Sequence, residues 1–484
     1  MTSLDTPRAK NLALLLLAMT QFMIVVDASI VNVALPSIGR ELEFSRENLS
    51  WVINAYTLVF GGFLLLGGRM ADLLGRRRLF MLGLGVFSVA SLVGGLSSND
   101  VMLIVARAFQ GLGAALVSPA ALSIVTTTFA EGAERNRALG VWGAVAGAGG
   151  AAGVLLGGVL TEYLGWEWVL WVNVPIGLFA AFLAPRLLPE SRDEVANRTF
   201  DLPGAFTVTA GLALLVYTIV DAESAGWTSG QTLGLGAVAL VLIGTFLVIE
   251  SRTRAPLMPL GIFRLRTLRG ANVVGLLIGM SLFSMFFFIS LYLQQVLGFS
   301  ALETGLAYLP LSIFIILSAG AASQLVTRLG FKPPLTAGLI LIAIGLLWFS
   351  RVDPGGSYVG DVLFPSLIVA VGLGFSFVPV TIAAVTGTSP AEAGLASGLI
   401  NTSQQIGGAL GVAILASVAN SVTNGSTAAT PGAALTEGFQ SAFLVGAGFA
   451  VAGAILTQVL ISSRDSREMV AKAKAGEAPA VAVG

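Results

Sequence analysis

The chain has 484 residues, of which 55% are apolar and only 11% are charged, whereas a soluble domain carries about 25% charged residues. This composition argues against a soluble enzyme and against a nucleic-acid-binding protein, and 26 basic against 26 acidic residues offer no net field to an anionic partner. The absence of cysteine and histidine excludes disulfides, thiol catalysis and zinc–thiolate sites, and it leaves proton handling to carboxylates.

Fourteen apolar runs follow one another along the chain, and each is long enough for a bilayer-crossing helix, which needs about 20 residues. The first run is too long for a signal peptide, lacks a small-residue cleavage pattern and is followed by thirteen more. We therefore predict an all-α membrane protein. In chain order the predicted spans are residues 12–36, 51–68, 79–97, 101–124, 137–160, 168–188, 203–221, 232–250, 270–295, 303–326, 333–350, 360–383, 394–421 and 438–461.

The basic residues orient these spans. An even number of spans places both termini on one side, and the loops on that side hold nearly all of the 26 Lys and Arg residues. Only Arg40, Arg46 and Arg351 lie in loops on the other side, so the positive-inside rule predicts that both termini are cytoplasmic. Few lysines beside 59 glycines are typical of a GC-rich bacterial gene, and we expect a multi-pass protein of the bacterial cell (inner) membrane.

Two polar loops divide the spans into groups. They flank the seventh and eighth spans, and without this pair six spans precede and six follow. We expect the last residues, which mix charges with alanine, to be disordered. The predicted domains are an N-terminal six-helix bundle at 1–188, two additional helices with cytoplasmic linkers at 189–269, a C-terminal six-helix bundle at 270–463 and a cytoplasmic tail at 464–484.

The strongest motif is GGRMADLLGRRR at 67–78, in the loop between the second and third spans. The positive-inside rule explains its arginines but not an acid at a fixed distance from two glycines. The motif resembles the major facilitator superfamily signature Gly-x-x-x-Asp-[Arg/Lys]-x-Gly-[Arg]-[Arg/Lys]. This resemblance implies a cytoplasmic gate motif, whose residues here are Gly68, Asp72, Gly75, Arg76 and Arg77.

A weaker copy of this motif, SQLVTRLGFK at 323–332, lies between the tenth and eleventh spans. When Gly330 is aligned with Gly75, Thr327 stands opposite Asp72. The second copy therefore has a neutral hydroxyl in place of the acid. Two related halves of one transporter predict such a repeat.

Four further segments resemble the fourteen-helix drug:proton antiporter branch of that superfamily. They are VDASIVNVALPSI at 26–38, RAFQGLGAA at 107–115, WEWVLWVNVPIG at 166–177 and NTSQQIGGALG at 401–411. The resemblance implies the major facilitator fold, with two six-helix bundles around a central cavity and the additional helix pair at the edge. It also implies proton-coupled export of hydrophobic drugs or antibiotics by alternating access.

Two positions depart from the pattern of this branch. Its fifth-helix motif reads Gly-Pro-x-x-Gly-Gly, and here GVLLGG has Val154 in place of the proline. The remaining glycines, Gly153, Gly157 and Gly158, let helices touch backbone to backbone, either as static packing or as a gating hinge. Glu167 replaces the usual arginine between two tryptophans, and nothing in the sequence explains this change of charge.

Ionisable groups inside a membrane are costly and usually functional, and only Asp27 and Arg107 lie well inside the predicted spans. Asp27 is about 22 Å from the inner end of its span, which leaves about 8 Å of a core about 30 Å thick. Arg107 is about 9 Å from the outer end of the fourth span, so the two residues share a level. They form either a structural ion pair or, as the resemblance implies, the proton-coupling site.

Polar and aromatic residues that share helix faces suggest a substrate cavity. On the thirteenth span three amide side chains recur at helical spacing, and on the ninth an aromatic face is followed by glutamines. For each aromatic the alternative is core packing or lipid contact, and the resemblance favours the glutamine of the Tyr-Leu-Gln segment. The predicted cavity residues are Gln110, Phe288, Tyr292, Gln294, Asn401, Gln404 and Gln405.

The sequence lacks the nucleotide-binding loop Gly-x-x-x-x-Gly-Lys-[Ser/Thr], so we expect a proton gradient, with no cofactor and no metal ion, to drive transport. The protein is then not an enzyme. Its expected partners are the lipid bilayer, small hydrophobic or amphipathic substrates and protons, with no nucleic acid, and we expect a monomer. One alternative is a secondary transporter dedicated to one metabolite, such as a self-made antibiotic, a siderophore or a lipid precursor. Another is a receptor or scaffold, against which the polar face of the thirteenth span argues.

Overall fold

The computed structural model describes residues 6–44, 49, 51–130, 132–191, 201–253, 256–389, 392–428 and 430–475. All regular secondary structure in these segments is helical. Thirteen of the described helices are long and apolar enough to cross a membrane, and a bent helix, α6, raises the total to fourteen. This confirms the prediction of an all-α protein with fourteen spans. Helices suit a membrane because every backbone polar group is satisfied within its own segment.

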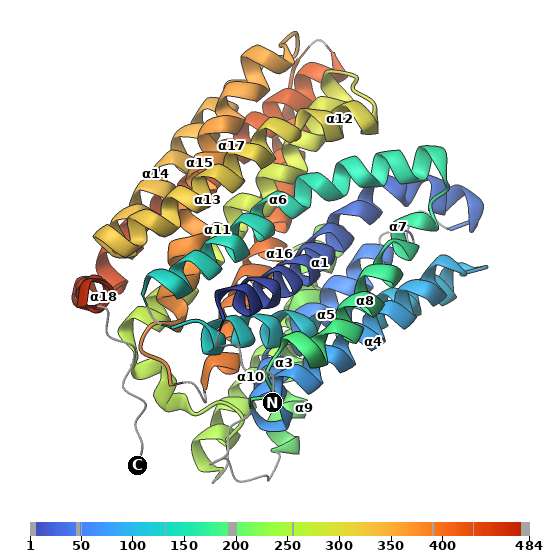
Figure 1. Cartoon of the computed structure of the whole chain (residues 1–484). Helices are drawn as coiled ribbons and strands as arrows, with labels where there is room; N and C mark the ends of the chain where they lie inside the picture. Colours follow the sequence, from blue (N-terminus) through green and yellow to red (C-terminus); the bar gives the residue numbers. More distant parts are fainter. Residues whose placement is uncertain are drawn as a thin grey trace. The chain divides into compact units, whose positions relative to one another are not determined.

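The long helices, labelled in Figure 1, follow one another with short connections. They are α1 (Pro7–Glu41), α3 (Trp51–Leu74), α4 (Arg76–Gly95), α5 (Asp100–Thr128), α6 (Ala133–Tyr163), α8 (Asn173–Leu187), α9 (Leu202–Ala225), α10 (Gly230–Arg252), α11 (Arg266–Leu291), α13 (Leu309–Leu329), α14 (Lys332–Phe349), α15 (Phe364–Val385), α16 (Ala393–Gly425) and α17 (Pro431–Leu460). The short elements are α7 (Trp168–Trp171), η1 (Leu260–Arg264), η2 (Tyr292–Val296), α12 (Ala301–Ala307), η3 (Tyr358–Leu363) and α18 (Ser463–Ala475).

Local sequence signals set many of the helix ends. Asp201 and Ser229 cap α9 and α10, because their side-chain oxygens accept hydrogen bonds from backbone N–H groups of the first turn. Gly75 and Gly330 separate α3 from α4 and α13 from α14, with φ angles of 109° and 84°. Only glycine adopts such angles readily, so each tight turn between two packed helices depends on it.

The described chain folds into two compact units. Unit 1 comprises Met1–Ile124, Gly149–Ile262 and Ser389–Thr402, and unit 2 comprises Val125–Ala148, Phe263–Thr388 and Ser403–Gly484. Two glycine-rich helices, α6 and α16, each contribute one segment to both units. The domain boundaries expected from the polar loops stay a prediction, because the units group residues by contact and not by chain order.

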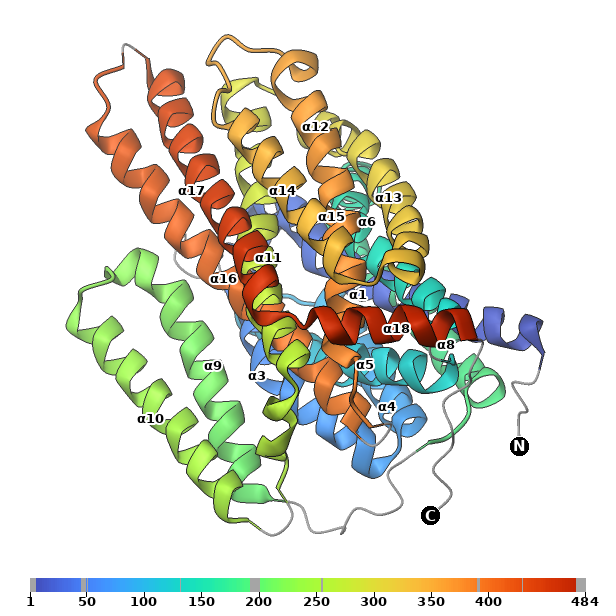
Figure 2. The same ribbon diagram turned by 90° about the vertical axis from the view of Figure 1, so that its left-hand side faces the viewer.

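The additional helices α9 and α10 form a hairpin in unit 1 (Figure 2). The hairpin is attached through α9, which packs along α3. A Cβ atom added to Gly62 of α3 would lie 2.9 Å from Ala213 Cβ, and Trp51 stacks on Tyr217 with ring centroids 5.7 Å apart. Helix α10 leaves most of its apolar side chains exposed, as expected for a helix that faces lipid.

The glycines of α6 bring its second half against α1. A Cβ atom on Gly153 would overlap the Ser29 hydroxyl, and one on Gly157 would lie 2.6 Å from the Ile30 carbonyl oxygen. The helix also bends by 43° between Ala133–Gly150 and Ala152–Tyr163. Static packing and a bend therefore occur in the same glycine-rich segment. Val154, which replaces the proline of the branch motif, lies near the bend, so no proline causes the bend.

The C-terminal tail differs from its prediction. Ser463–Ala475 form α18, which packs against α13 in unit 2. Thr267 donates a hydrogen bond to Asp465, and Lys332 Nζ donates to Ser463 Oγ at 2.9 Å. The expectation of disorder is wrong for these residues because contacts with other helices stabilise a segment that its own polar sequence does not. Residues 476–484 lie outside the described part of the chain.

We predict that Gly157→Ala lowers the thermal stability of the purified protein. The added methyl group has no room beside Ile30, and overpacking of this kind costs about 1–3 kcal/mol. The matched control is Gly150→Ala in the same helix, where a Cβ atom would meet nothing within 4 Å. Melting followed by size-exclusion chromatography should give a lower Tm for Gly157→Ala alone. Equal melting temperatures for the two variants would contradict the close α1–α6 contact.

Candidate functional site

A buried polar site of unit 1 surrounds the carboxylate of Asp27 on α1. Arg107 Nη1 of α5 donates to Asp27 Oδ2 at 2.7 Å, and this ion pair is 1% exposed at the arginine and fully buried at the aspartate. Asn173 Nδ2 of α8 and Gln110 Nε2 of α5 donate to Asp27 Oδ1 at 2.7 Å and 3.2 Å. We call Asp27, Arg107, Gln110, Asn173 and Ser91 the Asp27 cluster.

The arginine of this cluster is held by further contacts. Arg107 Nε donates to the Val52 carbonyl oxygen at 3.0 Å, and its Nη1 also donates to Gln110 Oε1 at 2.9 Å. The guanidinium carbon lies 4.4 Å from the centre of the Tyr56 ring. A cation over an aromatic face is stabilised by the ring quadrupole. Backbone, amide and ring together fix the guanidinium beside the carboxylate.

Helical spacing and interhelix packing assemble the cluster. Arg107 and Gln110 are three residues apart on α5 and so share one face. Gln110 Nε2 also donates to Ser91 Oγ of α4 at 2.6 Å, and Asn173 begins α8 directly after the single turn of α7. The ion pair joins α1 to α5 and is contacted by α3 and α8, while α4 is linked to it through Ser91 and Gln110.

The cluster is arranged for an ionised carboxylate. Every hydrogen bond described for Asp27 is one that it accepts, from a guanidinium and two amides. An ionised carboxylate is purely an acceptor, whereas a protonated one needs an acceptor for its own O–H group. The formal charges of Asp27 and Arg107 cancel, which limits the large cost of burying either alone. A proton added at Asp27 would require these donors to rearrange.

Asp27 and Arg107, expected at one depth, are brought together by the structure. Gln110 was expected in the substrate cavity, and the structure places its amide inside the Asp27 cluster, fully buried. Sequence reasoning did not single out Asn173, Ser91 or Tyr56. Asn173 lies in the WVNVPIG segment, and the resemblance of that segment to the antiporter branch could have identified it. A lone serine and a lone tyrosine in apolar helices offer no such resemblance.

A second buried ion pair occupies the gate motif. Arg76 Nη2 and Nε donate to Asp72 Oδ1 at 2.7 Å and 3.2 Å, and both side chains are buried. The same carboxylate accepts the backbone N–H groups of Gly394 and Leu395 at 3.1 Å each. These N–H groups open the first turn of α16, where the helix dipole favours an anion. Asp72 thus ties α3 to the start of α16 within unit 1.

The other residues of the motif support this contact. A Cβ atom on Gly68 would overlap the Gly394 carbonyl oxygen, so only glycine allows α3 and α16 to meet here. The backbone N–H of Arg77 donates to Glu190 Oε1 at 3.2 Å, and its Nη1 donates to the Leu188 carbonyl oxygen at 3.1 Å. The motif thereby fixes the end of α8 as well as the turn at Gly75.

The weaker copy of the motif makes a related contact in unit 2. Asn136 Nδ2, in the first turn of α6, donates to Thr327 Oγ1 at 3.0 Å. Ser323 Oγ donates to the Asn136 carbonyl oxygen at 2.6 Å, and a Cβ atom on Gly140 would lie 2.7 Å from Ser323 Cβ. Thr327 therefore contacts the start of α6 as Asp72 contacts the start of α16, but without a charge.

The aromatic residues predicted for a cavity are buried in unit 2. Phe288 packs against Phe439 and Phe443 with ring centroids 5.8 Å and 6.3 Å apart. The Tyr292 hydroxyl donates to the Asp353 carbonyl oxygen at 2.7 Å. These contacts match the core-packing alternative for both side chains. Gln294 lies nearby in the π-helical turn η2 and is exposed.

The predicted amides of α16 have mixed surroundings. Asn401 Nδ2 donates to the Ser397 carbonyl oxygen of its own helix at 2.9 Å. Gln404 Nε2 is buried without a hydrogen-bond partner among the described residues, and Gln405 is partly exposed. Asn401 belongs to unit 1 and the two glutamines to unit 2, so neither unit alone gathers the predicted cavity residues. No metal-binding group of three or more acidic side chains occurs in the described residues.

Comparison with known proteins assigns the chain to a family. A family model described as Major Facilitator Superfamily matches residues 17–412. The cephamycin export protein CmcT of Amycolatopsis lactamdurans is 42% identical over 457 residues, which cover 93% of this chain and 92% of that protein. The puromycin resistance protein pur8 of Streptomyces alboniger is 40% identical over 456 residues, covering 92% of this chain and 90% of that protein.

A solved structure shares the fold. The human organic anion transporter MFSD10 (TETRAN) matches with a TM-score of 0.67 at 17% sequence identity, covering 94% of this chain and 100% of that chain. At this identity the likeness concerns the fold alone. The family model spans most of the chain, and two antibiotic export or resistance proteins match it over nearly their whole length. The chain therefore belongs to the major facilitator superfamily of membrane transporters.

Proposed function

We propose that this transporter is a proton-coupled antiporter that exports hydrophobic drugs or antibiotics by alternating access. The observation that carries the proposal is the Asp27 cluster, a carboxylate buried among membrane-spanning helices and held by a single guanidinium and neutral amides. The printed names of the cephamycin and puromycin relatives support antibiotics as the substrate class.

In this mechanism Asp27 is the group that gains and loses the proton. Its present hydrogen bonds suit the ionised form, because Asp27 accepts each one from a guanidinium or an amide. Protonation would cancel the charge that holds Arg107 and release the guanidinium toward its other partners, the Val52 carbonyl and the Tyr56 ring. A proton gradient would then shift the balance between two arrangements of α1 and α5.

The gate motif would control the other end of the transport cycle. Asp72 holds the first turn of α16 by charge and by two backbone N–H groups. Breaking these contacts of Asp72 would free the first turn of α16 from α3. Arg76 would keep its hydrogen bond to Ser191 Oγ, which is 3.1 Å long. Each cycle would break and remake this contact, so its strength would set the turnover rate.

The orientation follows from the distribution of basic residues. Both termini and the gate motif would face the cytoplasm of a bacterial cell (inner) membrane, with protons entering from outside. No bound cofactor is needed in this scheme, since the proton gradient supplies the energy. The partners would be the bilayer, protons and small hydrophobic or amphipathic substrates, and the protein would act as a monomer.

A second candidate is the export of one antibiotic alone. It is favoured by the relative named for cephamycin export, which covers nearly the whole chain. The two candidates share the same coupling chemistry and differ only in the breadth of the substrate site.

We predict that Asp27→Asn abolishes efflux driven by an imposed pH gradient in proteoliposomes. The amide keeps the size of the carboxyl group but cannot carry a proton, so substrate movement is uncoupled from the gradient. Substrate exchange at equal pH on both sides needs no net proton transfer and should persist. The control Asp353→Asn changes an exposed acid whose carboxylate caps a loop N–H group, and it should leave both rates unchanged.

Two results would refute this role for Asp27. Wild-type gradient-driven efflux by Asp27→Asn would show that another group carries the proton. Loss of both gradient-driven efflux and exchange, in a variant with a normal size-exclusion profile, would show that the ion pair with Arg107 serves structure or substrate binding instead.

We also predict that Asp72→Asn lowers the maximal efflux rate about tenfold or more. Breaking a buried ion pair costs about 3–5 kcal/mol, and this loss weakens a contact that must form again in each cycle. The substrate Kd should change little. The control Glu468→Gln breaks the Arg464–Glu468 pair, which has the same four-residue spacing and the same 2.7 Å distance but is exposed. Exposed pairs contribute little, so this variant should transport normally. A weaker Kd with an unchanged maximal rate for Asp72→Asn would contradict a gating role.

A drug-susceptibility panel in an efflux-deficient host separates the two candidates. We predict resistance to several neutral, zwitterionic or singly charged amphipathic compounds, lost on addition of a protonophore, and weak or no resistance to dications. In α11–α17 the acids lie at helix ends, so only Asp27, offset by Arg107, could compensate a second buried positive charge. Resistance confined to one antibiotic would favour the dedicated exporter, and strong resistance to dications alone would contradict the charge argument.

A further inference from the structure

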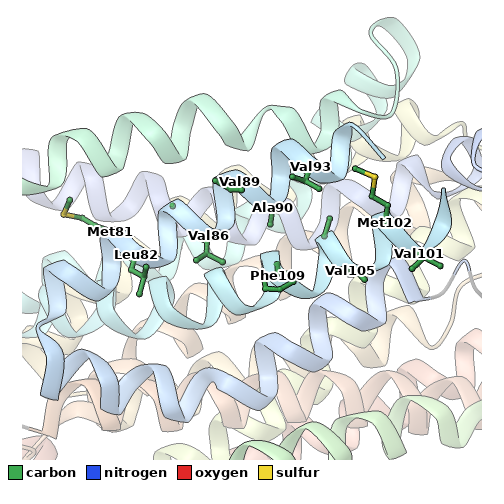
Figure 3. Close-up of a pocket in the computed structure, with 12 residues that line it drawn as sticks. Met81, Leu82, Val86, Val89, Ala90, Val93, Val101, Met102, Val105 and Phe109 are labelled. Atoms are coloured by element: carbon green, nitrogen blue, oxygen red, sulfur yellow. The ribbon is translucent and has the colours of Figure 1, made fainter. Parts of the chain in front are cut away.

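An apolar groove runs along the outer face of α4 and α5 in unit 1 (Figure 3). Its volume is about 830 Å³, and all of its lining side chains are apolar. We call it the α4–α5 groove. Its lining residues are Met81, Leu82, Gly85, Val86, Val89, Ala90 and Val93 of α4 and Val101, Met102, Val105, Ala106 and Phe109 of α5.

The bilayer determines what covers this groove. Both helices are membrane spans, and the rims, among them Leu82, Val89 and Phe109, are exposed, whereas Ala90 and Ala106 form a buried floor. Along α4 the groove extends from Met81 to Val93, which is about 18 Å at 1.5 Å per residue. One leaflet contributes about half of a hydrocarbon core about 30 Å thick. The groove is therefore slightly longer than one leaflet is thick, so an acyl chain that fills it reaches past the midplane.

A cation stands at one end of the groove. Arg78 lies three and four residues before Met81 and Leu82, so it shares their face of α4, about 6 Å beyond Leu82. Its side chain is 71% exposed, and its Nε is 3.7 Å from Glu190 Oε2. Arg77 Nε lies 3.6 Å from the same oxygen. One carboxylate thus serves two guanidinium groups, which leaves positive charge beside the end of the groove.

We propose that the α4–α5 groove is a binding site for one anionic phospholipid, with an acyl chain in the groove and its phosphate at Arg78. The phosphate belongs to the leaflet that meets the start of α4, which is the cytoplasmic leaflet in the proposed orientation. A chain that reaches Val101 and Phe109, near the start of α5, extends past the midplane of the bilayer. The site depends on the membrane-spanning fold and not on what the protein exports. An anionic headgroup gains from a nearby arginine, and a chain that fills the groove gains close carbon contacts.

The bound chain would lie directly behind the Asp27 cluster. Ala90 and Ala106 of the groove floor immediately precede Ser91 and Arg107 in the chain. The lipid would therefore press α4 and α5 together from the outside while the cluster joins them from the inside. Occupancy of the groove should raise the melting temperature of the protein.

Gly85 allows the groove to be filled without disturbing the fold. A Cβ atom there would meet nothing within 4 Å, so Gly85→Leu places its side chain in the space assigned to the acyl chain. Gly448→Leu on α17 is the matched control, because that exposed glycine also has nothing within 4 Å and lies outside the groove. For the headgroup the test variant is Arg78→Gln, with Arg328→Gln at the exposed end of α13 as its control.

The experiment uses full-length protein, delipidated in detergent, and adds phosphatidylglycerol or phosphatidylcholine with identical chains. Native mass spectrometry counts bound lipid, and thermal melting reports stabilisation. The wild-type protein and both controls should prefer phosphatidylglycerol and melt higher with it. Arg78→Gln should lose about fivefold in that preference, the factor expected for one arginine near an anionic surface. Gly85→Leu should bind both lipids about tenfold more weakly, through the loss of close carbon contacts.

Three results would overturn the proposal. They are undiminished lipid binding by Gly85→Leu, an unchanged headgroup preference in Arg78→Gln, and equal losses in the two controls. Displacement of the lipid by an exported drug, with drug binding also lost in Gly85→Leu, would assign the groove to substrate instead. Because the readout is lipid binding, failure here leaves the proton-coupled export proposal standing, and failure of Asp27→Asn leaves the groove standing.

Discussion

A charge inside a membrane must be neutralised by a partner, and unit 1 is organised around that requirement. Asp27 and Arg107 come from helices far apart in the sequence, and neither can be buried without the other. Their pairing fixes α1 against α5, and the remaining lone pairs and N–H groups bring in α4 and α8. The close α1–α6 contact through glycines then completes the packing on the other side of α1.

The two buried aspartates solve the same electrostatic problem in different ways. Asp27 is surrounded by side chains, which can turn when its charge changes. Asp72 is bound by the backbone of α16, which can leave only if the helix itself moves. The first arrangement suits a group that exchanges a proton, and the second suits a mechanical contact. Thr327, at the position that corresponds to Asp72, makes only a neutral hydrogen bond with Asn136. The start of α16 is therefore bound by a charged group, whereas Thr327 binds the start of α6 without a charge.

Much of the fold was predictable because the length of each apolar run is itself a physical requirement of the bilayer. The pairing of Asp27 with Arg107 was predictable for a similar reason, since depth follows from residue count along a helix. Helical periodicity gives a shared face but not the neighbour of that face, so it leaves both a cavity and core packing open for Phe288 and Tyr292, which are buried in unit 2. The sequence did not predict α18 because this helix is stabilised by contacts with residues distant in the chain, such as Thr267 and Lys332.

The division of α16 between the units has a consequence for how the chain folds during its synthesis. The members of the Asp27 cluster all lie before residue 174, so that cluster can form early. Unit 1 as a whole is incomplete until Ser389–Thr402 have been made. At about 5–20 residues per second, the ribosome takes on the order of ten seconds from Ile262 to that segment. During this interval Asp72 has no helix start to bind, and Arg76, one turn away on the next helix, is the partner already present to neutralise it.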